Sequence, residues 1–286
     1  MERIRAGHEA VRRANRQEVV EDYVEAIDDL VMDRGEARVR DLATGFGISH
    51  VAVCSVVERL RRDGLVSSGQ QEALRLTEKG RVIAERSRSR HAAVLAFLLA
   101  LGLPPEIAEA DAEGMEHHVG AESLEAFRQF VASRAKEGQP APVPASPGPL
   151  AEDAAPRFAR VRAAHANELT EDYVEAIDDM VRERGEARVG WLAERFGVAQ
   201  VTVTRVVARL RRLGHVTSPP RRPLELSGEG RALAARSRER HQVVLGFLLF
   251  LGVPDEAAEI DAEGVEHHVS ERTLARFAEL AGPKAP

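Results

Sequence analysis

The chain repeats itself at a fixed offset of 150 residues, and this duplication restricts it to two copies of one structural unit. A period of that length is too long for a solenoid, whose repeats run to roughly 20–50 residues. At 286 residues the chain has room for about two domains of roughly 100–200 residues each. Three motifs keep the offset without a gap: EDYVE at 21–25 and 171–175, DAEG(M/V)EHH at 111–118 and 261–268, and a lone histidine at His91 and His241.

A proline-rich segment separates the two copies. Residues 139–149 read QPAPVPASPGP, a composition that favours an extended polyproline II spacer of about 3.1 Å per residue. We therefore expect a fused dimer, in which two protomers that would otherwise associate are tied by a linker. Two independent units on a string are the alternative interpretation.

Within each copy the sequence predicts mostly helices. The chain is rich in Ala, Leu, Glu and Arg, which favour helices, and only 4% of its residues are aromatic. In the first copy we expect helices over 18–34, 39–46, 50–62, 78–101 and about 122–133, a further helix opened by Pro104 and Pro105 that carries 111–118, and a two-stranded hairpin over 66–76.

A helix, a tight glycine turn, a second helix and a hairpin follow one another in the order of a winged helix-turn-helix. The segment 38–66 has this order, and so does 188–216. The recognition helices would be His50–Arg62 and Gln200–Arg212. A generic helical hairpin with a solvated arginine face is the alternative, but the recurrence of the pattern beside the acidic motifs favours the DNA-binding interpretation.

The residues that we expect to contact DNA lie on the recognition helices and on the second wing. The wing of the second copy reads SPPRRPLEL, with Arg221 and Arg222 at its tip, whereas the first copy has Gln71 and Glu72 in the corresponding places. We therefore expect the second copy to be the stronger DNA reader. The candidate DNA-binding residues are Ser49, His50, Ser55, Arg59, Gln200, Thr202, Thr204, Arg205, Arg221 and Arg222.

Two acidic motifs and two histidines per copy have the spacing of metal ligands. On a helix, Asp22 and Glu25 project from the same face, and so do Glu113, Glu116 and His117. With His91 they make four carboxylates and two imidazoles, enough for two divalent ions if one carboxylate bridges them. A solvated acidic face is the alternative, but both motifs are kept together in two copies, which favours metal.

The ligand types also bear on the kind of ion. The single cysteine, Cys54, leaves no thiolate motif, and oxygen-rich sites with some imidazole suit Mn(II) or Fe(II) rather than Zn(II) or Cu(I). A net charge of −6 argues mildly against nucleic acid, but two divalent ions per copy would bring the charge to about +2. His118 and His268 follow the presumed ligand histidines, and we expect them to support the ligands from behind or to lie at the surface.

These motifs, in this order, resemble the manganese-responsive (MntR-type) branch of the DtxR family of bacterial metalloregulators. The resemblance covers about 115 residues of each copy. It implies a repressor of metal-uptake genes, a family in which homodimers of one such unit are usual. In these regulators a binuclear Mn(II) site fixes the DNA-binding domain against the dimerisation helices. The implied ligands are Asp22, Glu25, His91, Glu113, Glu116 and His117, and in the second copy Asp172, Glu175, His241, Glu263, Glu266 and His267.

The chain also departs from the pattern of that family. Tandem fusion is unusual, so we expect either an intrachain pseudodimer or a homodimer of the fused chain. Val51 and Val201 stand where a proline is common, and Ala52 replaces the usual hydroxyl residue. The iron-sensing branch has a methionine where Asp22 stands and a cysteine where Glu113 stands, which favours manganese, although an Fe(II)-responsive regulator remains an alternative.

Together these features predict a mainly α protein with a duplicated winged helix-turn-helix and helical metal-binding and dimerisation region. We expect a cytoplasmic regulator that binds a double-stranded DNA operator, with no signal peptide, no membrane span and no enzymatic activity. A di-metal carboxylate enzyme and a metal-free regulator with structural acidic clusters are the rival interpretations. The expected divisions are a tail at 1–16, winged helices at 17–77 and 161–227, helical regions at 78–134 and 228–286, and a linker at 135–160.

Overall fold

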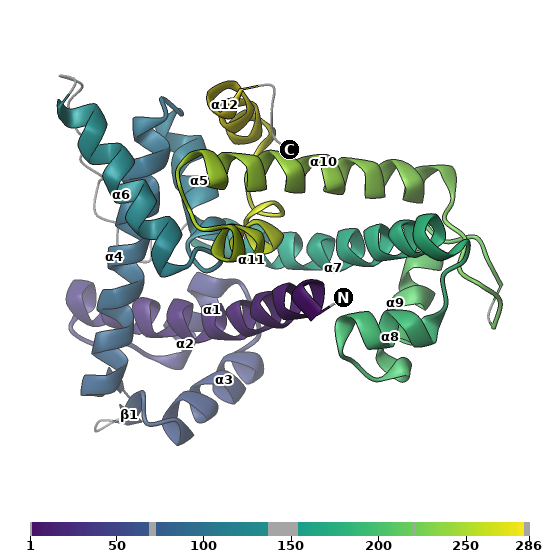
Figure 1. Cartoon of the computed structure of the whole chain (residues 1–286). Helices are drawn as coiled ribbons and strands as arrows, with labels where there is room; N and C mark the ends of the chain where they lie inside the picture. The colour runs from purple at the N-terminus through teal and green to yellow at the C-terminus, as the bar shows by residue number, and fades with distance from the viewer. Residues whose placement is uncertain (1, 69–72, 137–153, 220, 283–286) are drawn as a thin grey trace. The chain divides into compact units, whose positions relative to one another are not determined.

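Both repeats of the computed structural model consist of helices and a small wing, in the part of the chain that the structure describes, residues 2–68, 73–136, 154–219 and 221–282 (Figure 1). The first repeat runs through α1 (Glu2–Arg34), α2 (Val39–Phe46), α3 (His50–Arg62), β1 (Val66–Ser68), β2 (Leu74–Leu76), α4 (Glu78–Ala100), α5 (Pro105–Met115) and α6 (Ala121–Lys136). The second runs through α7 (Ala154–Arg184), α8 (Val189–Phe196), α9 (Gln200–Arg212), α10 (Gly228–Phe250), α11 (Asp255–Val265) and α12 (Glu271–Ala281). The predicted mainly helical fold with a tandem duplication is confirmed.

The first helix is longer than the sequence pattern indicated. The helix expected from Glu18 begins at Glu2, so residues 2–16 of the predicted tail belong to it. This stretch contains no proline and is rich in Arg, Glu and Ala, which sustain a helix even without an apolar stripe. Similarly, α6 continues to Lys136 and α7 begins at Ala154, both inside the predicted linker 135–160. The polyproline II prediction for 139–149 lies outside the described residues.

The chain divides into two compact units. One unit is Ala14–Ala163, and the other joins Ala164–Pro286 to Met1–Arg13. Each unit contains one winged helix-turn-helix and the helical region that follows it.

The winged helix-turn-helix of each unit, called the reading head from here on, is built on the first helix of that unit. Tyr23, Val24 and Ile27 of α1 are buried in one cluster with side chains of α2, α3 and both wing strands. The ring of Tyr23 stacks on that of Phe46 with centroids 4.4 Å apart, and Tyr173 stacks on Phe196 at 4.2 Å in the second unit. Because this face of α1 is fixed in the head, its other face is available to the helices that follow the wing.

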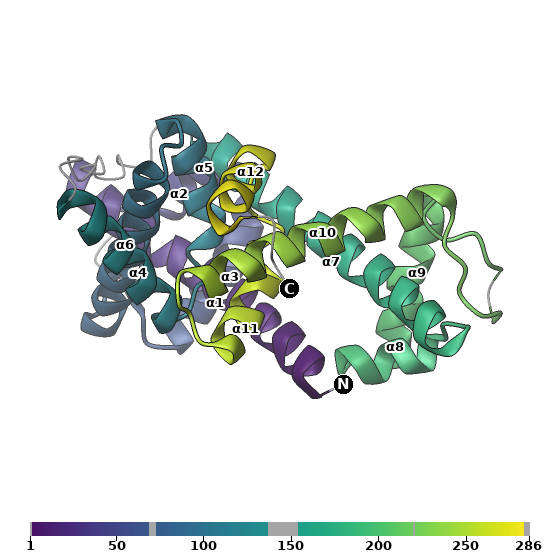
Figure 2. The same cartoon turned by 45° about the horizontal axis from the view of Figure 1, so that its top comes forward.

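A second group of helices packs around α4 in the first unit and around α10 in the second. α4 packs against α5 and α6, and α10 packs against α11 and α12, an arrangement that both views display (Figures 1 and 2). Phe97 stacks on Phe127 with centroids 4.0 Å apart, and Phe247 stacks on Phe277 at the same distance. The start of α4 lies directly on the wing, since a Cβ at Gly80 would meet the carbonyl oxygen of Leu65 at 2.3 Å.

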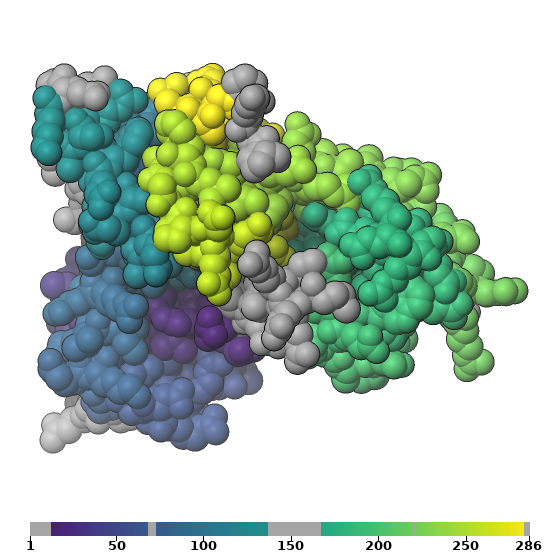
Figure 3. Space-filling model, in the orientation of Figure 1, coloured from purple at the N-terminus to yellow at the C-terminus, as the bar shows by residue number. Residues whose placement is uncertain are grey.

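The wings of the two repeats differ in the residues that the structure describes. In the first repeat β1 and β2 pair antiparallel, with Val66 opposite Leu76. In the second repeat the expected hairpin is reduced to an isolated bridge between Val216 and Leu226. Thr217 still donates to the carbonyl oxygen of Glu225 at 2.9 Å, but the N–H of Glu225 donates to the side-chain oxygen of Ser218 at 3.2 Å, so no regular strands form among the described residues of this wing. The second wing projects from its unit (Figure 3).

No helix among the described residues is long and apolar enough to cross a membrane.

Candidate metal centre and nucleic-acid interface

Three helices of the first unit bring the six predicted ligands together. α1 carries Asp22 and Glu25, and α4 carries His91. Glu113 lies on α5, but α5 ends at Met115, so Glu116 is its C-cap and His117 lies in the turn that follows. The prediction of one helix carrying 111–118 is therefore wrong at its end. In this turn the His117 ring lies against α1. If α5 continued through His117, its geometry would not by itself bring the ring there.

Short distances join five of these side chains directly. Nδ1 of His91 lies 2.8 Å from Oε2 of Glu116 and 3.8 Å from Oε2 of Glu113. Nε2 of His117 lies 3.2 Å from Oε1 of Glu116 and 3.7 Å from Oδ1 of Asp22. Glu116 thus lies between the two imidazoles, in the position that a bridging carboxylate would occupy.

The sixth residue, Glu25, lies in the same electrostatic environment. Burial and, after it, the neighbouring carboxylates of Glu116 and Glu113 together raise the pKa of Glu25 to about 7. Its Oε1 is buried without a hydrogen-bond partner in the described part of the chain.

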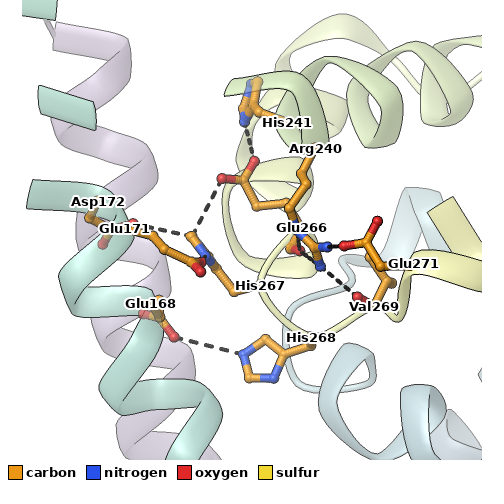
Figure 4. A network of polar contacts seen from close by, with 10 residues as sticks. All are labelled: Glu168, Glu171, Asp172, Arg240, His241, Glu266, His267, His268, Val269 and Glu271. Atoms are coloured by element: carbon orange, nitrogen blue, oxygen red, sulfur yellow. Dashed lines mark hydrogen bonds and ion pairs between the residues drawn. The ribbon is translucent and has the colours of Figure 1, made fainter. Parts of the chain in front are cut away.

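The second unit repeats this arrangement (Figure 4). Nδ1 of His241 lies 2.6 Å from Oε2 of Glu266, a contact drawn in Figure 4. The same atom lies 3.9 Å from Oε2 of Glu263. Nε2 of His267 lies 3.1 Å from Oδ1 of Asp172 and 3.4 Å from Oε1 of Glu266. Glu175 lies close to this group: burial raises its pKa, and His241 and Glu263 are among its charged neighbours.

Four further carboxylates face the opposite nitrogens of the four histidines, two of them through hydrogen bonds, and the sequence did not identify them as site residues. Nδ1 of His117 lies 2.8 Å from Glu21, and Nδ1 of His267 lies 2.7 Å from Glu171. Nε2 of His91 lies 3.3 Å from Glu109, and Nε2 of His241 lies 3.7 Å from Glu259. Each imidazole therefore has one nitrogen toward the ligand group and one toward a carboxylate, the arrangement that orients metal-binding histidines in proteins.

The only sequence signal for these four carboxylates was their place in the duplication. Glu21 and Glu171 stand inside the repeated EDYVE segment, and Glu109 and Glu259 keep the offset of 150. Spacing along a helix could not reveal them, because each meets a histidine from another helix.

The charges at the site favour protonated histidines when no cation is bound. Burial by itself lowers the pKa of His91, but hydrogen bonds to Glu109 and Glu116 outweigh burial and raise the pKa to about 10. The same competition raises the pKa of His241 to about 9, with Glu266 as the main partner. Burial raises the pKa of Asp22 well above its usual value. Buried carboxylates at this density need positive charge, from protons or from a cation.

The donor set fits a hard divalent cation. One ligand atom each from His91, Glu113 and Glu116 lie within 4.8 Å of one another, and all three residues are buried. The unpartnered Oε1 of Glu25 adds an oxygen that a cation would satisfy. Oxygen and imidazole donors without thiolate match the preferences of Mn(II) and Fe(II).

The histidines that follow the ligand positions are buried. His118 is 7% exposed, and the side chain of His268 is 2% exposed. The alternative that they lie at the surface is therefore wrong. Nε2 of His268 lies 3.7 Å from Glu168, one turn before Glu171 on α7 (Figure 4).

In each unit, two neighbouring aspartates of the first helix form ion pairs with an arginine of the helix that follows the wing. Arg88 of α4 bonds to Asp28 and lies 3.4 Å from Asp29. Arg238 of α10 lies 3.1 Å from Asp178 and 2.8 Å from Asp179. These ion pairs hold the two helices together independently of the predicted metal ligands.

The predicted DNA-reading residues of both recognition helices are exposed, with one exception. His50 and Ser55 of α3 and Gln200, Thr202, Thr204 and Arg205 of α9 are exposed, whereas Arg59 is half-buried. Ser49 is exposed and also caps α3, accepting a hydrogen bond from the backbone N–H of Ala52 at 3.3 Å. Ala199, in the same place before α9, makes no side-chain cap.

The second wing presents its two arginines to solvent. Arg221 and Arg222 are exposed, and Arg221 has a positive φ of 67°. Arg211 supports the base of the wing by donating to the carbonyl oxygen of Ser218 at 2.7 Å. The tip of the first wing, with Gln71 and Glu72, lies outside the described residues.

Comparison with known proteins gives the same combination of domains. The family described as "Iron dependent repressor, metal binding and dimerisation domain" matches residues 77–144 and 227–283. The family described as "Iron dependent repressor, N-terminal DNA binding domain" matches residues 166–224.

The matches to two curated relatives are each about as long as one repeat. The Transcriptional regulator MntR of Escherichia coli O157:H7 is 53% identical over 120 residues, which is 42% of this chain and 77% of that protein. The HTH-type transcriptional regulator MntR of Bacillus subtilis (strain 168) is 34% identical over 110 residues, 38% of this chain and 78% of that protein. A solved structure, described as the crystal structure of T. acidophilum IdeR, is 26% identical with a TM-score of 0.35, and the match covers 44% of this chain and 61% of that one.

Proposed function

The chain belongs to the iron-dependent repressor family of metal-dependent, DNA-binding transcriptional regulators, and from this premise we propose that it is a manganese(II)-responsive repressor of metal homeostasis genes. The observation that carries the proposal is the convergence of four carboxylates and two imidazoles at the same helix junction in both repeats. The identity of 53% to a regulator named MntR supports manganese as the ion.

Two Mn(II) ions per repeat would be held by the residues that converge on Glu116 and on Glu266. Bound ions supply positive charge that offsets the buried carboxylates. The proposed ligands are Asp22, Glu25, His91, Glu113, Glu116 and His117 in the first repeat and Asp172, Glu175, His241, Glu263, Glu266 and His267 in the second.

The proposed ligands connect the reading head to the helical region within each unit. Asp22 and Glu25 stand on α1, whose other face is buried in the core of the head. Glu113 and His117 belong to α5 and the turn after it, which pack with α4. When both groups of side chains are held together, the head keeps one orientation; when the carboxylates repel one another, it samples several.

The partner in this proposal is a double-stranded operator with two half-sites, bound by an intrachain pseudodimer rather than by a homodimer of the fused chain. The helical regions of both repeats match a metal-binding and dimerisation family, which supplies one dimerisation surface per repeat in a single chain. Such a regulator acts in the cytoplasm, where the DNA is, and has no catalytic role.

Fluorescence anisotropy on duplex DNA from the region upstream of the gene tests this function. We expect Mn(II), and less strongly Fe(II), to tighten binding of the full chain, with Zn(II) the weakest. The double variant Glu25→Gln with Glu175→Gln should lose this metal response. The matched control is Glu106→Gln with Glu256→Gln, which changes exposed glutamates on α5 and α11. DNA affinity that is equal with and without metal would refute the proposal.

A further inference from the structure

We propose that the two recognition helices read different base sequences. The operator of this chain then consists of two unlike half-sites, and the chain binds it in one orientation. The inference rests on the proposed function and specifies the DNA that the same surfaces recognise. It is drawn from the pattern of exposure along α3 and α9.

The two recognition helices have identical covered faces. Val53, Val57 and Leu60 of α3 are buried, and the equivalent positions of α9 carry the same residue types. The three half-buried positions of each helix also match. Packing against the reading head therefore holds both helices in the same register, and the same positions face outward in both.

The exposed faces of these helices differ at five of seven positions. Val51 and Arg62, which match Val201 and Arg212, are the two exposed positions that agree. The five that differ are His50 and Gln200, Ala52 and Thr202, Cys54 and Thr204, Ser55 and Arg205, and Glu58 and Ala208. Differences confined to the outward face do not arise from packing, so they bear on what that face contacts.

The exposed groups of α9 suit specific reading in the major groove. A glutamine such as Gln200 can bond to adenine N6 and N7, and an arginine such as Arg205 can bond to guanine O6 and N7, each through two hydrogen bonds. The hydroxyl of Thr204 donates to the carbonyl oxygen of Gln200 at 2.8 Å, which leaves its methyl group for a thymine methyl. α9 therefore carries two side chains capable of bidentate base contacts.

The exposed groups of α3 offer a different and weaker set of contacts. Ser55 and Ala52 replace Arg205 and Thr202, so α3 has no arginine at the position where α9 offers one for the arginine–guanine pair. Glu58 adds a negative charge, held 3.5 Å from Arg61, where α9 has the neutral Ala208. Glu58 reduces attraction to phosphate and favours a cytosine amino group.

In vitro selection from random duplexes, with the full chain and Mn(II), tests the inference. We expect two enriched half-sites, about one helical turn apart, with different sequences. Arg205→Ser should relax the preference at one position of one half-site, with affinity for the selected duplex falling on the order of tenfold. Ser55→Arg should introduce a guanine into the other half-site.

A five-residue exchange provides the converse experiment. Replacing the exposed residues of α3 by those of α9 (His50→Gln, Ala52→Thr, Cys54→Thr, Ser55→Arg and Glu58→Ala) should make the selected sequence symmetric. These positions are exposed, so the core of the head is unchanged.

Two outcomes would overturn the inference and leave the proposed function standing. One is a symmetric sequence selected by the native chain. The other is an equal loss of preference in both half-sites on Arg205→Ser, which means that two chains read DNA with their second repeats. If Mn(II) enriches no sequence at all, the proposed function itself is refuted.

Discussion

The two repeats agree at the proposed metal centre and differ on the recognition helix. Both place the same six side-chain types at similar distances, at the junction of α1, α4 and α5 and again at that of α7, α10 and α11. Their recognition helices, in contrast, share only two of seven exposed residues. A metal centre needs a fixed number of donors in one geometry, so a copy that bound metal through these proposed ligands could not change them without losing the ion. A reading face need only match its own DNA. Fusing the protomers frees the copies to differ there, because a fused chain no longer has to present the same face twice.

The two proposed metal centres have the same composition but differ in burial. The side chain of Glu21 is 4% exposed and bonded to Arg90, whereas that of Glu171 is 22% exposed. In the second repeat the equivalent Arg240 donates instead to the carbonyl oxygens of Glu266 and Val269. A cleft of about 400 Å³, lined in part by Glu171, Arg236 and Arg240, lies beside them.

The largest effect is expected from removing one ligand in one repeat. His117→Ala should abolish the Mn(II) sites of the first repeat, and His267→Ala those of the second, lowering the affinity of the altered repeat by more than about 100-fold. Isothermal titration calorimetry should then count about two ions per chain in place of about four. If the number of Mn(II) ions bound per chain is unchanged in either variant, the two centres are not equivalent.

A smaller effect, and a difference between the repeats, is expected from the carboxylates behind the histidines. Glu21→Gln keeps the shape of the side chain but weakens its hold on Nδ1 of His117, and the Mn(II) affinity of the first repeat should fall by about 10- to 100-fold. Glu171→Gln should have an effect nearer the lower limit, because Glu171 is more exposed.

Each of these variants is measured with the other repeat silenced by its histidine-to-alanine substitution. Glu122→Gln, an exposed change on α6, is the control. Equal losses in both repeats would show that the difference in burial has no energetic consequence.

The next effect concerns the stability of the metal-free protein, which should depend on pH differently in the two units. Their carboxylate partners raise the pKa values of His91 and His241 in the folded state to about 10 and about 9, above the unfolded value of roughly 6.5. The stability from these ion pairs is fully present below pH ~6.5 and is lost as the pH rises through the folded pKa.

We therefore expect each unit to lose on the order of 1–2 kcal/mol between pH ~6.5 and ~10 in the presence of a chelator. The first unit should lose its share at the higher pH, and urea denaturation followed by circular dichroism measures both. Stability that increases with pH over this interval would contradict the assignment of these ion pairs.

The smallest effect concerns the start of the recognition helices. Ser49→Ala should destabilise the first reading head by about 1 kcal/mol, because it removes the cap of α3. Ala199→Ser should stabilise the second head by a similar amount, since α9 begins without a side-chain cap. Hydrogen exchange at the first turn of each helix reports both changes, and Thr44→Ala, at an exposed site on α2, serves as a control.

Much of this molecule could be predicted because its signals are local or repeated. Apolar spacing and glycine positions gave most of the helix ends, for instance α2 ending before Gly47, which adopts φ 62°. The six ligand types were identifiable because a duplication that preserves Asp22, Glu25 and the EHH segment is hard to explain by solvated surface alone. The length of α1 was missed, since its N-terminal half has no apolar stripe to mark it.

What the sequence by itself determined is the duplicated helical fold and the inventory of donors in each copy, because helix formation and face sharing depend on neighbours three or four residues away. Tertiary structure alone decided which nitrogen of each histidine meets the ligand group, and that Glu21 and Glu109 face the other nitrogen of His117 and of His91. It also decided that α5 stops at Met115 and turns His117 toward α1, and which residues of α3 and α9 face outward together. These features arise from packing between helices far apart in the chain, and residue spacing holds no record of the distances across such contacts.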